Sequence, residues 1–185
     1  MRPYHYPHTI ENGAGERLTI LRRVPGPAGD RLEIENVVAP GAGPVMHVHH
    51  LQAEVLTVRQ GRLAYQRPSG PARYVEVGQT VAFPAGDAHR FWNAGTDDLR
   101  CSGYIEPAGN IEYFLGAIFE SQRQTGRGGP HPLDAAFLVR RYRSEFALVD
   151  IPAWVQRLVF PVLVAVGTLL GRYGKYADAP EAARG

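Results

Sequence analysis

Short apolar–polar segments separated by turn residues run from residue 17 to residue 105, and this pattern constrains the fold more than any other feature. In Arg31–Pro40, for example, Leu32 and Ile34 alternate with charged side chains, as in a half-buried strand. Turn sequences such as PGPAGD, RPSGP, PAGD and NAGTDD follow one another at short intervals. Regularly spaced short strands are typical of an antiparallel β-sandwich or β-barrel. We expect strands over Arg17–Pro25, Arg31–Pro40, Pro44–His50, Ala53–Arg59, Gly61–Gln66, Ala72–Val77, Gln79–Phe83, His89–Asn93 and Leu99–Ile105.

The pattern changes to a helical one after residue 106. In Asn110–Gln124 the apolar residues recur at the three- and four-residue spacing of an amphipathic helix. A Gly- and Pro-rich break follows, and Leu133–Phe146 is expected to form a second helix. The sequence therefore predicts a mainly β fold with a helical C-terminal extension. Residues 1–106 would form an N-terminal arm and a barrel, and residues 107–185 a helical region that packs on the barrel or on a partner.

Composition excludes some classes of protein. The chain has 185 residues, 44% of them hydrophobic, which fits one packed domain. Its formal net charge of +2 comes without long basic clusters, so we expect no nucleic-acid binding. A single cysteine, Cys101, cannot form an intrachain disulfide, and we expect it to be buried. The N-terminus lacks the apolar stretch of a signal peptide, which predicts a cytoplasmic protein.

Three histidines lie within four positions in the segment MHVHHLQAE. Alternate residues of a strand share a face, so His47 and His49 should point to the same side and His50 to the other. Glu54 would join the first two only if the chain bends around Leu51–Gln52. A fourth candidate ligand, His89, begins a strand after a turn. Imidazole and carboxylate ligands suit divalent ions such as Fe, Mn, Ni, Zn, Cu or Co.

The glycines around these residues complete two spaced motifs that closely resemble those of the cupin superfamily. The resemblance covers about Val37–Glu106, with the motifs at 41–93, and it implies a small antiparallel barrel, the double-stranded β-helix. It also implies that His47, His49, Glu54 and His89 hold one metal ion at one mouth of the barrel. The later helical sequence resembles the tail of small quercetin-dioxygenase-like cupins. The ten matching positions are Gly41, His47, His49, Glu54 and Gly61 in the first motif, and Gly78, Pro84, Gly86, His89 and Asn93 in the second.

Strand alternation also predicts the surroundings of the metal. If His89 points inward, Phe91 should line the cavity, while Arg90 and Trp92 point away. Val45, Leu56 and Val58 would join Phe91 in an apolar substrate pocket, which suits a small hydrophobic ligand. Three other residues, Tyr65, Tyr104 and Glu106, are either polar pocket groups or part of the strand surface. The remaining histidines, His5, His8 and His131, lie in Pro-rich loops and are expected to be solvated.

The resemblance predicts a metal-dependent, dioxygenase-like oxidoreductase. Four protein ligands leave one or two positions of an octahedral ion for substrate or oxygen. The quercetinase likeness implies that Glu54 is the catalytic residue, taking a proton from a bound phenol or enol. One alternative is a non-catalytic ligand-binding or sensor module with a structural metal. A further alternative, a sugar isomerase or epimerase, fits less well with an apolar pocket. Cupin barrels commonly pair through their outer strands, so a homodimer is expected.

An apolar segment at residues 151–171 allows three interpretations. Its uncharged part, Leu158–Gly171, has fourteen residues, fewer than the ~20 of a transmembrane helix. Aromatic and basic residues flank it, as at a bilayer surface. We expect a helix that packs on the fold or on a partner subunit. Association with a membrane surface is the main alternative, and a marginal transmembrane span is the third interpretation.

Overall fold

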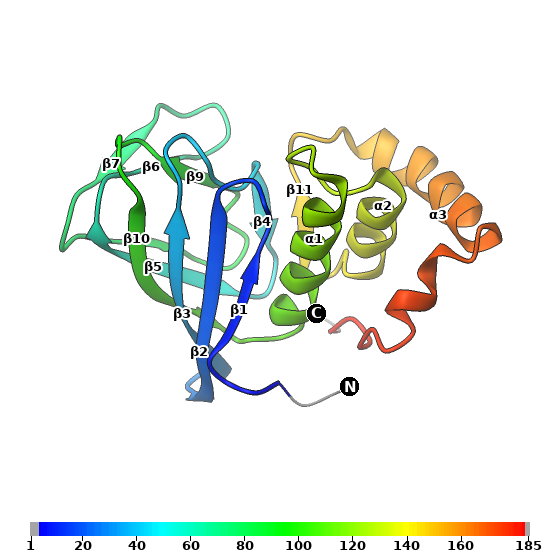
Figure 1. Ribbon diagram of the computed structural model, residues 1–185, viewed down its shortest axis with the longest axis horizontal. Helices are drawn as coiled ribbons and strands as arrows, with labels where there is room; N and C mark the ends of the chain where they lie inside the picture. Colours follow the sequence, from blue (N-terminus) through cyan, green and yellow to red (C-terminus); the bar gives the residue numbers. More distant parts are fainter. Residues whose placement is uncertain (1–3, 184–185) are drawn as a thin grey trace.

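Two structural regions lie side by side in the computed structural model, which describes residues 4–183 (Figure 1). Most of the strands occupy the left of the view, and the helices lie on the right. The strands are β1 (His8–Glu11), β2 (Glu16–Gly26), β3 (Gly29–Val38), β4 (His47–His49), β5 (Ala53–Gln60), β6 (Leu63–Gln66), β7 (Arg73–Val75), β8 (Thr80–Phe83), β9 (Arg90–Asn93), β10 (Leu99–Glu106) and β11 (Phe146–Leu148).

The strands form an antiparallel barrel. One sheet has the order β1-β2-β3-β10-β5-β8, and smaller sheets have the orders β7-β6-β9 and β11-β4. A single bridge between His47 and His89 joins the two smaller sheets at the start of β9. This topology, followed by helices, confirms the expected double-stranded β-helix with a helical C-terminal extension. All nine predicted strands are present, and most of their ends lie within three residues of the predicted positions.

Alternating side chains of the strands fill the barrel. In β5 the buried positions are Glu54, Leu56 and Val58, so one face of this strand points inward along its length. Each fully buried aliphatic side chain stabilises the fold by about 1.5–3 kcal/mol. Cys101 on β10 belongs to the same core, as expected, and burial raises the pKa of its thiol to about 12. It therefore acts as a small apolar residue.

The helical region contains α1 (Ile111–Thr125), α2 (Pro132–Arg141), the π-helical turn η1 (Val155–Val159), α3 (Phe160–Leu169) and the 3-10 turn η2 (Arg172–Tyr176). Helix α1 closes the barrel core with Ile111 and Phe119. The side chain of His131 caps the start of α2 by accepting a hydrogen bond from the backbone N–H of Leu133 at 3.2 Å. His8 contacts the buried Glu112 at 3.3 Å. The expectation that both histidines are merely solvated is therefore wrong.

The second predicted helix, Leu133–Phe146, is wrong at its C-terminal end. Helix α2 ends at Arg141, and Phe146 begins β11, which pairs antiparallel with β4. In this register Phe146 lies opposite His49, and Leu148 lies opposite His47. Phe146 is buried there, so this pairing replaces the last turn of the expected helix. The helical region thus contributes a strand to the sheet that carries two of the candidate ligands.

Glu145, just before β11, links the helical region to the bend between β4 and β5. The carboxylate has no exposed surface and accepts hydrogen bonds from Gln52 Nε2, from both the backbone and side-chain nitrogens of Asn110, and from Ala183 N. Its backbone oxygen accepts from His50 N at 2.7 Å. Since Gln52 and His50 form the bend between β4 and β5, Glu145 fixes that bend to the helical region.

The apolar segment at 151–171 packs on α2 rather than on the barrel. Phe160 contacts Ala136 and Val139, and only Phe160 and Gly167 of α3 are buried. Most of its other apolar side chains face away from the fold, so the expectation that the segment packs into the fold holds for one side only. Among the described residues no helix combines the length and the apolar character needed to cross a membrane. Packing on a partner subunit stays a prediction.

Candidate metal centre

The four candidate ligands meet inside the barrel. Ligand atoms of His47, His49, Glu54 and His89 all lie within 4.8 Å of one another. The imidazole ring centres of His47 and His89 are 4.5 Å apart, and those of His47 and His49 are 4.9 Å apart. Only His47 is partly exposed, and the other three are buried. The structure therefore brings the predicted ligand set together as one cluster that could hold a metal ion.

The local backbone explains why these residues meet. A bend at residues 50–52 separates β4 from β5 and turns Glu54 to the same side as His49. His50 is exposed at this bend, as strand parity predicts. Gly43 lies so close to β9 that a Cβ atom there would be 2.1 Å from the carbonyl oxygen of Phe91. This close approach, which sequence reasoning missed, lets the chain before β4 run along β9 and reach His89.

Hydrogen bonds orient two of the rings. The Nδ1 atom of His47 lies 2.8 Å from the carbonyl oxygen of Val45, and Nδ1 of His89 lies 2.8 Å from that of Asp87. A carbonyl oxygen only accepts, so each Nδ1 carries the proton and each Nε2 is free to bind a metal. His49 differs, because its buried Nδ1 has no hydrogen-bond partner among the described residues.

The contact between His89 and Glu54 indicates a cation. Nε2 of His89 is 3.2 Å from Oε2 of Glu54, and Nε2 of His49 is 3.7 Å from the same oxygen. A neutral His89 whose Nδ1 holds the proton turns a lone pair towards the carboxylate, which is repulsive. Either a second proton on His89 or a metal ion between the two groups removes that repulsion. The donor set thus fits a divalent transition metal.

Protonation in the cluster favours metal binding. Burial lowers the pKa of His49 to about 3, and burial together with the neighbouring His89 lowers that of His47. Burial alone would raise the pKa of Glu54, but a hydrogen bond that His89 donates when its ring is doubly protonated, and the charge its histidine neighbours can carry, lower it to about 2. Near neutral pH the imidazoles of His47 and His49 are therefore neutral and the carboxylate of Glu54 is ionised. These are the forms that bind metals.

Aromatic rings hold the ligands in place. Phe83 stacks on His89 with ring centres 3.7 Å apart and planes 1° apart. Phe146 of β11 meets the ring of His49 edge-on at 5.5 Å. The role of Phe146 was missed in the sequence, where it is assigned to a helix. No local signal could have revealed it, because its partner strand is distant along the chain.

An arginine clamp supports the turn before His89. Arg67 donates to Asp87 through Nε at 2.9 and 3.0 Å and through Nη2 at 2.6 Å. The carbonyl of Asp87 accepts the bond from His89, so the clamp positions that ligand. Replacing Arg67 with alanine should weaken metal binding by about 10- to 100-fold, as for other partners that orient ligands. Competition of the purified protein with a chelating dye measures this change.

The matched control for this variant is Arg90→Ala. Arg90 follows His89 directly but is exposed and donates only to Gln66 among the described residues. Its removal should leave metal affinity unchanged. Equal affinity of the Arg67 variant and the wild type would contradict a positioning role for the clamp.

The predicted pocket residues occupy two different environments. Leu56, Val58 and Phe91 are buried in the barrel core, whereas Val45 is 60% exposed and contributes its carbonyl to His47. Their role as a substrate pocket stays a prediction. Arg90 is exposed and Phe91 buried, as alternation predicts.

Three further polar candidates belong to the framework of the barrel. Glu106 pairs with Arg31 and accepts from Ala28 N, which anchors the β2–β3 hairpin. Tyr104 lies under the guanidinium of Arg31 at 4.0 Å, and Tyr65 packs edge-on against Phe83 at 5.6 Å. The structure therefore gives Glu106 and Tyr104 structural contacts, and Tyr65 supports a ring that stacks on a candidate ligand.

Comparison with protein families and known proteins finds sequences similar to the barrel. A protein-family model described as a cupin domain matches residues 35–103. The probable oxidoreductase virH of Hypocrea virens is 31% identical over 70 residues, which are 37% of this chain and 32% of virH. The chain thus matches about a third of the length of this curated relative.

Similar solved structures share low sequence identity. A Klebsiella pneumoniae protein with a double-stranded β-helix domain is 19% identical, covers 57% of this chain and 82% of its own, and has a TM-score of 0.43. KdgF from Halomonas sp. is 18% identical, with coverages of 52% and 84% and a TM-score of 0.45. A sugar phosphate isomerase from Silicibacter pomeroyi is 23% identical, with coverages of 49% and 59% and a TM-score of 0.42.

The family match and the barrel topology agree: residues 35–103 match the cupin-domain model, and the strands of this range form a double-stranded β-helix. All four cluster residues and the clamp of Arg67 and Asp87 lie inside the matched range. The strand β11, Glu145 and Phe146 lie outside it and come from the helical region.

Proposed function

We propose that this chain is a metal-dependent enzyme of the dioxygenase-like kind, which oxidises a small organic molecule with dioxygen. The observation that carries the proposal is the buried cluster of three imidazoles and one carboxylate, in which the His89 lone pair and Glu54 face each other at 3.2 Å. When bound by His47, His49, Glu54 and His89, a redox-active divalent ion supplies Lewis-acid and electron-transfer chemistry at its open positions.

The protein groups around the cluster have separate roles in this proposal. Glu54 is the one carboxylate of the cluster, so it is the group that takes the proton of a substrate phenol or enol hydroxyl. His47 is the one ligand with exposed surface, and Val45 beside it is exposed too, so substrate approaches from this side. Leu56 and Phe91 make the inner wall apolar and exclude water.

The similarity to a probable oxidoreductase supports the same class of reaction. It extends over 70 residues, so the proposal takes only the class of chemistry from it, and no substrate. We propose flavonols and enolisable diketones as the first substrates to test. Both classes have an acidic hydroxyl for Glu54 and an apolar body for the inner wall.

The test is oxygen consumption by protein reconstituted separately with Fe, Mn, Ni, Co, Cu and Zn ions. We expect turnover with at least one redox-active metal and none with zinc. His49→Ala should lose both metal and turnover, and His50→Ala, whose side chain is exposed next to it, should retain both. Glu54→Gln that still binds metal should be slower by about 10²–10⁴-fold, the usual contribution of a general base.

Full metal loading without oxygen consumption across these substrates would contradict the dioxygenase proposal. Retention of a small molecule without turnover would then favour a ligand-binding or sensor module. Exchange of substrate C–H protons with solvent in the absence of oxygen would favour an isomerase or epimerase. These two outcomes separate the alternative functions from each other as well as from the first.

A further inference from the structure

An apolar stripe runs along the outer side of η1 and α3. It consists of residues at three- and four-residue intervals, which share one face of a helix. Their side chains are 42–87% exposed, although they are large and apolar. Contiguous exposed apolar surface of this kind marks an interaction site in soluble proteins. The stripe residues are Trp154, Leu158, Val162, Val166, Leu169 and Leu170.

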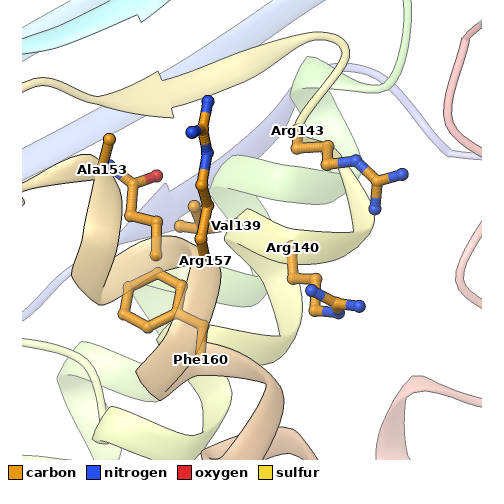
Figure 2. A pocket seen from close by; sticks show the side chains of 7 residues that line it. Val139, Arg140, Arg143, Ala153, Arg157 and Phe160 are labelled. Atoms are coloured by element: carbon orange, nitrogen blue, oxygen red, sulfur yellow. The ribbon is translucent and has the colours of Figure 1, made fainter.

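A basic cleft lies beside this stripe, between the end of α2 and η1 (Figure 2). Its volume is about 460 Å³, and Arg140, Arg143 and Arg157 line it together with Phe160. Figure 2 shows Arg140 and Arg143 extending from the α2 side and Arg157 from the helix opposite. Within residues 4–183 none of these three arginines makes an ion pair or a side-chain hydrogen bond. The cleft therefore carries three uncompensated positive charges next to an apolar surface.

We propose that the helical C-terminal region docks on an anionic lipid surface. In this arrangement the apolar stripe enters the boundary between headgroups and acyl chains, and a lipid phosphate occupies the basic cleft. Trp154 at one end of the stripe has the amphipathic ring that is enriched at this depth. With ten residues, α3 lies on the surface and does not cross it.

Charge favours a lipid surface over a second copy of the chain. A two-fold interface uses the same patch on both subunits, so it would bring two sets of uncompensated arginines together. The segment from Ile151 to Tyr176 contains no acidic residue that could neutralise them. Anionic headgroups supply that neutralisation. In addition, α3 lies at the edge of the molecule opposite the barrel (Figure 1), so a flat surface can reach it.

The test is co-sedimentation of the full-length protein with vesicles. We expect binding to vesicles of equal parts phosphatidylcholine and phosphatidylglycerol, weak binding to phosphatidylcholine alone, and release at high salt. A second readout is the fluorescence of Trp154 in a Trp92→Phe background, which should shift to shorter wavelength only with the anionic vesicles. Thermal melting of each variant monitors folding.

Matched variants separate the two parts of the surface. The double variant Arg140→Glu, Arg157→Glu should lower the partition coefficient at least about 25-fold, because each basic residue near the surface contributes a factor of about five. Leu158→Ser with Val162→Ser should lower it at least about tenfold. The controls are Arg100→Glu and Val77→Ser, which change an exposed arginine and an exposed valine on the barrel. Both controls should bind like the wild type.

Failure to bind either kind of vesicle, or equal binding to both, would overturn the proposal. So would a dimer in sedimentation velocity that Val162→Glu dissociates while anionic vesicles remain unbound, because the stripe would then be an interface between copies. Selective binding of free phosphate without vesicle binding would also overturn it. Metal content and oxygen consumption should be unaffected in every variant, which keeps this test independent of the proposed function.

Discussion

Substitution of His49 with alanine is expected to abolish the stabilisation of this protein by divalent metal ions. His49 is buried within a cluster whose ligand atoms lie within 4.8 Å of one another, so its loss removes one of four ligands and leaves a gap inside the cluster. A metal present at about 100 times its dissociation constant stabilises the native state by about 2.7 kcal/mol. For a chain of this size that is a rise in Tm of roughly 5–10 °C.

The measurement is the shift in Tm on adding each metal, together with elemental analysis of the dialysed protein. The shift is the useful quantity, because removal of a buried imidazole can lower the Tm of the metal-free protein by itself. His50→Ala serves as the control, since its side chain is exposed one position away. If His49→Ala kept both the shift and the metal, the cluster would not be the metal site.

Substitution of Asp134 with asparagine should have the second large effect, in this case on stability. The Asp134 side chain has no exposed surface and pairs with Arg172 and Lys175 of η2, both at 2.8 Å. It also accepts a hydrogen bond from Ser121 of α1. Asparagine has almost the same shape but leaves both cations without a partner. Breaking a fully buried ion pair costs about 3–5 kcal/mol, and we expect a smaller loss here because Arg172 and Lys175 are about a third exposed and stay hydrated.

The pH dependence of this loss of stability shows whether the charge of Asp134 causes it. Burial would raise the pKa of Asp134, but its bonds to Arg172, Lys175 and Ser121 lower it to about 2 from the ordinary 3.8. The ionised group therefore stabilises the fold at and above about pH 5, and this contribution is lost as the pH falls towards 2. Urea unfolding should show the full difference between wild type and variant near neutral pH and a much smaller one near pH 2.

Glu120→Gln is the control for this second prediction. Glu120 pairs with Arg123 on the exposed side of α1, and an exposed pair of this kind contributes less than about 1 kcal/mol. Hydrogen exchange should show faster opening of α2 and η2 in the Asp134 variant only. An Asp134→Asn protein as stable as the wild type near neutral pH would mean that the ion pairs do not hold η2 against α2.

Local sequence signals were sufficient for most of the barrel. Period-two alternation and turn residues predicted nine strands, and the resemblance to the cupin motifs implied that His47, His49, Glu54 and His89 would meet. Parity also identified the bend that Glu54 requires and the outward direction of His50. These predictions depend on residues close together in the sequence or on fixed spacings between turns. Both kinds of pattern are present in the barrel strands.

The errors arise where contacts between segments far apart in the sequence determine the secondary structure or the packing. Phe146 fits the period of a helix, yet it forms a strand because β4 lies beside it and buries its ring against His49. Strand β1, only four residues long, was missed because its register with β2 has no local signature. The one-sided packing of α3 was missed for a related reason. Its sequence is apolar on all sides, so periodicity could not show which side meets Phe160 and α2.

The pairing of β11 with β4 sets an order of events during synthesis. Gln52 in the bend after β4 and Glu145 before β11 are 93 residues apart along the chain, and contacts this distant form late in folding. A ribosome releases the chain from its N-terminus, so His47, His49, Glu54 and His89 all emerge before the strand that supports two of them. We therefore expect the nascent barrel to hold metal weakly until Phe146–Leu148 has been released and has paired with β4.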